Sequence, residues 1–90
     1  MFALKVLFDD EKAAQEALSS IRTAWTEQHG DHPDYYAALQ KLLQQPLHYR
    51  PAIFAEKDVL ACEFYGFDEK ESAMVEAAFL DVGALEVVVE

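Results

Sequence analysis

The histidines and aspartates near the middle of the chain are the side chains whose types suit a metal site. His29 and His32 bracket a short polar segment, His48 follows further along, and Asp31 or Asp34 offers a carboxylate. A metal site needs neutral imidazoles that converge with a third ligand. Because histidines at a helix end or in a turn are commonly solvated, this spacing predicts no metal site and no cofactor.

Cys62 is the single cysteine, and its surroundings in the sequence do not suit nucleophilic catalysis. A reactive thiol needs an accessible, electropositive setting with a base beside it. Cys62 instead falls in a stretch of alternating apolar residues, where a small buried side chain is expected. The sequence also has no glycine-rich phosphate loop and no Gly-x-Ser-x-Gly elbow. We therefore predict no catalytic residue.

Carboxylates are abundant in this chain of 90 residues, which has 17 Asp plus Glu against 7 Lys plus Arg and a formal net charge of −10. Residues 1–50 carry 7 of these acids and 5 of the bases, whereas residues 51–90 carry 10 acids and 2 bases. The negative charge is therefore concentrated in the second half. It disfavours direct binding to nucleic acid or to an anionic membrane, because both present phosphates that repel it.

The segment 68–81 combines this charge with a helical pattern, and it is the predicted docking surface for a protein partner. An acidic surface steers a basic partner toward it, and the effect weakens as salt rises. The alternative is a solvated face that keeps a small protein soluble. The predicted docking residues are Asp68, Glu69, Glu71, Glu76 and Asp81.

The elements of the first half follow from apolar periodicity and from capping residues. Residues 2–8 alternate with the period of a strand, and the carboxylates at 9–11 mark the start of a helix that Gly30 ends. Asp31 is the expected cap of a second helix, which runs to Pro46. Trp25 follows the apolar stripe of the first helix, which predicts a core position, with a partner anchor as the alternative.

The second half begins with a change of period. Residues 52–65 predict a hairpin with a polar corner at 56–58. Asp68 and Glu71 have the spacing of a capping box for a third helix, which Gly83 ends. Residues 85–90 alternate as a last strand. The predicted order is therefore strand, two helices, β-hairpin, helix and strand.

This order predicts an α+β, ferredoxin-like split β-α-β fold that uses residues 1–90 as one domain. Its four-stranded antiparallel sheet has the first and third strands in the centre. Pro51 fits an edge strand, because proline cannot donate to a ladder. The alternative makes residues 59–66 helical and leaves a three-stranded parallel sheet with helices.

On the ferredoxin-like fold, helices cover one face of the sheet and the other face stays open. Alternation assigns ten residues to the covered face: Phe2, Leu4, Val6, Phe8, Leu60, Cys62, Phe64, Leu85, Val87 and Val89. The opposite face is too apolar to be left in water. We expect a second copy, another partner or the helix at residues 33–45 to cover it. The predicted assembly residues are Leu7, Val59, Tyr65 and Val88.

Residues 32–43 resemble the barstar family of small acidic intracellular ribonuclease inhibitors. The run His-Pro-Asp-Tyr-Tyr at 32–36, followed by leucines at 39, 42 and 43, is similar to the loop and second helix of that family. The chain departs from the family at 37–39, where Ala-Ala-Leu replaces a Gly-x-Asn step. Gln40, Lys41 and Gln44 stand where inhibitory carboxylates are expected. The resemblance implies an inhibitor, and it carries over no functional residue.

These observations predict a small, non-catalytic, acidic interaction protein. It is an inhibitor or immunity-type protein that docks a basic partner surface through its C-terminal half. A cytoplasmic location is expected, because one cysteine forms no intramolecular disulfide and no secretory signal is visible. The alternative is a homodimeric ligand-binding protein or small enzyme with its site between facing sheets. Glu63, Tyr65 and Glu86 would be the candidate group of that site.

Overall fold

The computed structural model of the protein describes residues 1–28 and 32–90. The predictions made for His29, Gly30 and Asp31 therefore lie outside the described residues. The helices and strands follow one another as β1 (Phe2–Phe8), α1 (Glu11–Gln28), α2 (Pro33–Leu43), β2 (Tyr49–Phe54), β3 (Lys57–Phe67), α3 (Glu69–Asp81) and β4 (Glu86–Val89).

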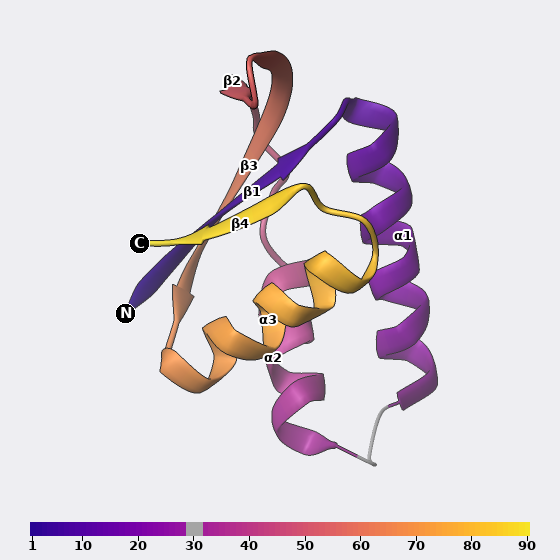
Figure 1. The fold of residues 1–90 in the computed structure, drawn as a ribbon. Helices are drawn as coiled ribbons and strands as arrows, with labels where there is room; N and C mark the ends of the chain where they lie inside the picture. The colour runs from indigo at the N-terminus through magenta and orange to yellow at the C-terminus, as the bar shows by residue number, and fades with distance from the viewer. Residues whose placement is uncertain (29–31) are drawn as a thin grey trace.

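The four strands form one antiparallel sheet in the order β2-β3-β1-β4, and the helices lie on one side of it (Figure 1). The predicted α+β fold with a split β-α-β arrangement is thus confirmed. The three-stranded parallel alternative is wrong, because residues 57–67 form a strand that pairs with β1 on one side and with β2 on the other. Pro51 lies in β2, at the edge, where its missing N–H removes no bond from the centre of the sheet.

Local capping interactions explain where two of the helices begin. The Asp10 carboxylate accepts a hydrogen bond of 2.8 Å from the Ala13 N–H at the start of α1. At α3 the Asp68 carboxylate accepts from the Glu71 N–H at 2.7 Å, and Glu71 Oε1 accepts from the Asp68 N–H at 3.0 Å. The predicted capping box is therefore confirmed. At α2 the N-cap position is His32, whose side chain makes no capping hydrogen bond.

The hairpin turns one residue earlier than its polar residues suggested. Ala55 and Glu56 form the turn with φ of 52° and 66°, and Lys57 and Asp58 belong to β3. A two-residue turn with positive φ at both positions matches the twist of the flanking strands. The predicted corner at 56–58 is wrong, because the pairing of Phe54 with Lys57 leaves only two residues between the strands.

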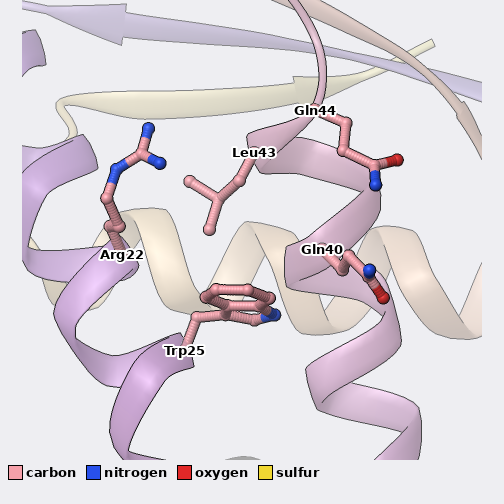
Figure 2. Close-up of a pocket in the computed structure, with 5 residues that line it drawn as sticks. All are labelled: Arg22, Trp25, Gln40, Leu43 and Gln44. Carbon is pink, nitrogen blue, oxygen red and sulfur yellow. The ribbon is translucent and has the colours of Figure 1, made fainter.

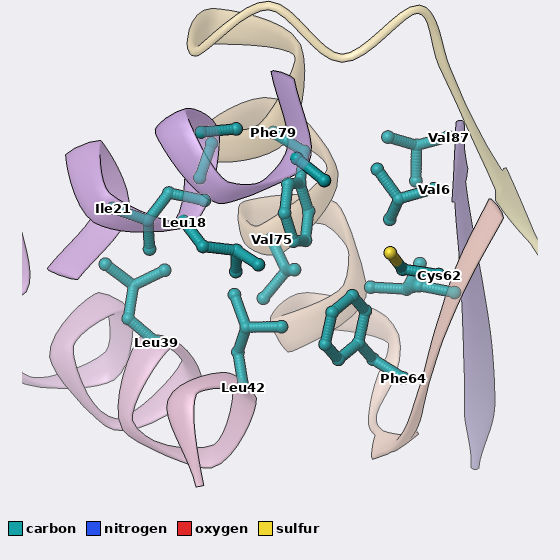
Figure 3. Close-up of a cluster of buried hydrophobic side chains, with 14 of the residues drawn as sticks. Val6, Leu18, Ile21, Leu39, Leu42, Cys62, Phe64, Val75, Phe79 and Val87 are labelled. Atoms are coloured by element: carbon teal, nitrogen blue, oxygen red, sulfur yellow. The ribbon is translucent and has the colours of Figure 1, made fainter. Parts of the chain in front are cut away.

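The main core lies between the helices and the sheet (Figure 3). Phe79 of α3 is central to it: its ring packs edge-on to Phe8 with centroids 5.9 Å apart and stacks on Phe64 at 5.5 Å. The predicted covered-face residues Leu4, Val6, Phe8, Cys62, Phe64 and Val87 are all buried there. Gly83 ends α3 as predicted, with a φ of 98° that favours glycine.

A second, smaller cluster lies on the opposite face of the sheet. Leu7, Val59 and Ala61 are buried there, and side chains of the same face pack over them. Leu85 belongs to this cluster and not to the helix-covered face as predicted, because it precedes β4 and its N–H donates to the Leu7 carbonyl. The expectation that residues 33–45 cover this face is also wrong, since α2 packs against α1 and α3. The partly buried side chains over the cluster are Ala52, Phe54 and Leu85.

Candidate functional site

Two of the five predicted docking residues hold the fold together. Asp68 and Glu71 cap α3, and Glu71 also accepts a hydrogen bond of 2.7 Å from the Lys41 ammonium of α2. Lys41 donates to the Gly66 carbonyl at 2.8 Å as well, and its ammonium lies 5.8 Å from the centre of the Phe67 ring. The charge of Glu71 is therefore neutralised inside the protein, and it adds little to an external acidic surface.

The other three predicted docking residues lie along the outer side of α3. Glu69 and Asp81 are exposed and Glu76 is half-buried. Helical spacing places an apolar row between them, and the Leu80 side chain in that row is 49% exposed. We call this surface the α3 outer strip; it consists of Glu69, Ala73, Glu76, Ala77, Leu80 and Asp81.

The cation nearest the strip in sequence is already engaged. The Lys70 ammonium donates a hydrogen bond to the Asp34 carboxylate of α2, and this bond and the charge of Asp34 raise the pKa of Lys70. Asp81 lies near Tyr35 of α2: burial first, and then the charge of Asp81, raise the pKa of that phenol. Lys70 therefore does not neutralise the three carboxylates of the α3 outer strip, because it is paired with Asp34 of α2.

The four predicted assembly residues on the sheet do not form one exposed patch. Leu7 and Val59 are each 5% exposed, whereas Tyr65 is 55% and Val88 37% exposed. Leu7 and Val59 are buried in the small cluster, against which Ala52, Phe54 and Leu85 pack. The apolar centre that was expected to need a partner is therefore covered within the chain.

Glu63 and Tyr65, two of the three residues predicted for an enzymatic site on this face, contact each other and a neighbouring arginine. The Tyr65 hydroxyl donates a hydrogen bond to Glu63, and the Arg50 guanidinium lies 3.7 Å from the same carboxylate. That hydrogen bond is the main cause that raises the pKa of Tyr65, so the phenol stays protonated and is a poor base. Lys5 lies opposite Glu63 on one side and Val88 on the other, while Glu86 lies opposite Leu7.

Cys62 is buried in the main core, where the sequence predicted a small hydrophobic residue. Burial raises the pKa of its thiol to about 11. A thiol that stays protonated and out of reach of solvent is inert as a nucleophile.

Within the described residues, no three His, Cys, Asp or Glu side chains come close enough together to hold a metal ion. His32 and His48 are both exposed, and the third histidine lies outside the described residues. Over the same residues, no helix is both long enough and apolar enough to cross a membrane.

The structure also contains a groove that sequence reasoning missed. It lies between α1 and α2, has a volume of about 160 Å³ and is lined by Arg22, Trp25, Gln40, Leu43 and Gln44 (Figure 2). The signal in the sequence was the spacing of Arg22 with Trp25 and of Gln40 with Gln44, which places each pair on one side of its helix. Trp25 packs against the main core as predicted, but only partly, and its other surface lines the groove.

The hairpin end of the sheet has a second cavity, of about 140 Å³. It lies beside the small cluster, and its polar lining consists of one acid and one base, Asp9 and Lys57. Phe54, Ala55, Val59 and Leu85 complete the lining. Asp9 and Lys57 are the titratable side chains among these six residues.

No model of a protein family, no curated protein and no solved structure matches this chain. The resemblance of residues 32–43 to the barstar family therefore rests on those residues alone.

Proposed function

We propose that the protein is a small, non-catalytic interaction protein whose α3 outer strip docks a basic surface of a partner protein. The observation that carries the proposal is the arrangement of Glu69, Glu76 and Asp81 around an exposed apolar row on one helix. The other two predicted docking residues have roles within the fold: Asp68 and Glu71 cap α3, and Glu71 also pairs with Lys41.

The apolar row gives the strip a centre that excludes water. Ala73 and Ala77 are small and exposed, so a partner element can approach the helix backbone closely, and Leu80 offers a larger side chain at one end. Interfaces commonly bury such a centre inside a polar rim that shields it from solvent. The strip therefore fits an amphipathic partner element with an apolar ridge flanked by lysine or arginine.

The charge of the chain favours a basic partner. The three carboxylates of the strip are part of a formal net charge of −10, and the neighbouring Lys70 is paired with Asp34. This field attracts a basic protein over several ångströms and repels nucleic acid, so we do not propose direct nucleic-acid binding.

An inhibitor or immunity-type protein is the functional class that this proposal favours, since occlusion of a basic active site needs an acidic surface and no catalysis. We propose that this activity lies in the cytoplasm, because the single cysteine is a buried free thiol. The homodimer with facing sheets remains the alternative proposal, and the burial of Leu7 and Val59 within the chain gives it less support.

The experiment compares two charge reversals of equal size. Glu69→Lys with Glu76→Lys changes the strip, and Glu16→Lys with Glu27→Lys makes the same change on exposed positions of α1. A photo-crosslinking residue at position 77 captures the partner from a native lysate, and the affinity of the purified partner is then measured for each variant. We expect the α3 reversal to weaken binding by at least about tenfold and the α1 reversal by about twofold or less.

Salt provides the second readout. Wild-type affinity should fall by about tenfold between about 50 mM and about 300 mM NaCl, because exposed charge pairs are screened over that range. A captured partner whose binding does not respond to salt, or one that the two reversals weaken equally, contradicts the proposal. Circular dichroism of each variant separates lost docking from lost folding.

A further inference from the structure

The outer edge of β4 has no strand beside it in the described part of the chain. β4 is the last strand in the sheet order, so it pairs with β1 on one side only (Figure 1). Ala3 and Glu90 exchange backbone hydrogen bonds of 2.9 and 2.8 Å across these two segments. Such pairs recur at every second residue of an antiparallel ladder, so the N–H and C=O groups of Val87 and Val89 point away from β1. These backbone groups are available to an added strand.

The two edges of the sheet are not equivalent. Pro51 lies in β2, the other edge, and it has no N–H to offer to an added strand. β4 contains neither proline nor glycine: it reads Glu-Val-Val-Val, and β-branched residues favour an extended backbone. The side chains of Val88 and Val89 are 37% and 40% exposed, so an added strand would also bury apolar surface. β4 is therefore the edge at which a strand can add.

The side chains along this edge define what the added strand must carry. Val87 is buried in the main core. By alternation, Glu86, Val88 and Glu90 point to the open face of the sheet. Both carboxylates are exposed, and the ion pairs among residues 1–28 and 32–90 include neither of them. Because opposite charges at directly paired positions stabilise a sheet, a matching strand has lysine or arginine opposite each glutamate and β-branched residues between them.

A second copy of this chain does not match the edge. Pairing two β4 strands antiparallel, with the Val87 of each opposite the Val89 of the other, also puts the Glu86 of each opposite the Glu90 of the other. Like charges at directly opposed positions are destabilising, and each copy carries a formal net charge of −10. The two glutamates therefore act against self-association, whereas they attract a basic segment.

We propose that the β4 edge binds an extended basic segment of a partner protein as a fifth strand, antiparallel like every other pair in the sheet. Main-chain hydrogen bonds to Val87 and Val89 supply affinity, and cations opposite Glu86 and Glu90 supply selectivity. The edge shares no residue with the α3 outer strip, so the inference does not rest on the proposed function.

The probe is the acetylated and amidated peptide Thr-Lys-Val-Thr-Val-Lys-Thr. Its lysines fall opposite the two glutamates, and its valines fall opposite Val87 and Val89. In a titration followed by ¹⁵N correlation spectra, we expect saturable shifts that are largest in β4, with amide exchange of Val87 and Val89 slowed by at least about fivefold at saturation. The same peptide with glutamate in place of both lysines should bind at least about tenfold more weakly.

Backbone pairing is tested in the peptide, because a change there leaves the folding of the protein untouched. N-methylation of both valines removes the N–H groups that face β4, and we expect at least about tenfold weaker binding. N-methylation of both lysines removes N–H groups that face away from β4, so the affinity should change by about threefold or less.

Variants of the protein test the same contacts from the other side. Val89→Pro removes an outward N–H and leaves the bonds between β1 and β4 in place, and it should weaken binding by at least about tenfold. Val89→Ala also shortens the side chain but keeps the N–H, so about threefold or less is expected. Glu86→Lys with Glu90→Lys should remove the preference for lysine over glutamate in the peptide. The equal reversal on α1, Glu16→Lys with Glu27→Lys, should retain it.

Several results would overturn the assignment of the edge. They are the absence of a saturable shift, shifts confined to other elements, equal binding of the lysine and glutamate peptides, and equal effects of the two N-methylated peptides. A peptide that loses affinity with Glu69→Lys and Glu76→Lys, but not with the β4 reversal, binds the α3 outer strip; that result overturns the edge while it supports the proposed function. A dimer that Val89→Pro dissociates would show that a second copy occupies the edge, and it would overturn the basic segment. The dispersion of each spectrum shows whether a variant is folded.

Discussion

The Lys41 ammonium of α2 lies 2.7 Å from Glu71 Oε1, and this one carboxylate oxygen also accepts the Asp68 N–H at the start of α3. Because Lys41 donates to the Gly66 carbonyl at the end of β3 as well, a single side chain joins α2, α3 and β3. The two side chains are 37% and 18% exposed, so the pair is only partly screened by water. The contact explains why a residue of the acidic helix is unavailable to a partner.

Removing Lys41 should therefore destabilise the protein. We expect Lys41→Met to lower the free energy of unfolding by about 1–2 kcal/mol, because Glu71 and the Gly66 carbonyl lose a charged donor. Glu71→Gln keeps an acceptor for the capping box and removes only the charge. A double-mutant cycle by urea unfolding measures the coupling, and additive effects of the two changes would contradict a direct interaction.

The hairpin turn offers a stabilising change. Ala55 and Glu56 both adopt positive φ, a region that favours asparagine and glycine over these residues. Ala55→Asn together with Glu56→Gly should raise the free energy of unfolding by about 1–2 kcal/mol. Ala77→Gly, at an exposed helical position, should lower it by about 1 kcal/mol, which shows that the gain depends on φ and not on glycine itself.

The protein should lose stability in alkaline solution because of Cys62. Burial raises the pKa of this thiol from 9.0 to about 11, so the folded protein holds the proton more tightly than the unfolded chain does. The resulting stabilisation is fully present below pH 9 and is lost as the pH rises toward 11, up to about 3 kcal/mol. Tyr35 and Tyr49, whose pKa values burial also raises, act in the same direction above pH 10.

Cys62→Ala isolates the contribution of the thiol. The variant should be less stable by about 1 kcal/mol near neutral pH because a buried sulfur is removed. Its stability should then fall less steeply than that of the wild type between about pH 9 and about pH 10, measured by urea unfolding at each pH. Parallel curves for the two proteins would show that another group causes the alkaline loss.

Phe54 should carry much of the stability of the small cluster. It packs against the small cluster on the open face of the sheet, so Phe54→Ala should lower the free energy of unfolding by about 2 kcal/mol and increase the binding of a hydrophobic dye. The adjacent Ile53 is 73% exposed, and Ile53→Ala should change stability by about 0.5 kcal/mol or less. Equal losses in the two variants would mean that Phe54 is not a cover for the cluster.

Local signals account for the part of the fold that sequence reasoning predicted. Asp10 and the pair Asp68 and Glu71 mark helix starts because a cap needs only residues within one turn of each other. The element order was predictable for the same reason, since periodicity is a property of a continuous segment. Leu85 was misplaced because the alternation that defines a face starts only where β4 begins pairing, at Glu86.

The residue types of the candidate site were predictable from the sequence, but the contacts that these residues make in the fold were not. The sequence alone identifies the acidic helix at 69–81, its cap and its charge, because these depend on neighbours along the chain. Only the tertiary structure decides that Glu71 is neutralised by Lys41, and that Phe54 packs against the small cluster on the sheet. It also brings Arg22 to face Gln40 across a groove. Each of these contacts joins segments whose distance depends on how helices and strands pack, and packing is set by side chains far apart in the sequence.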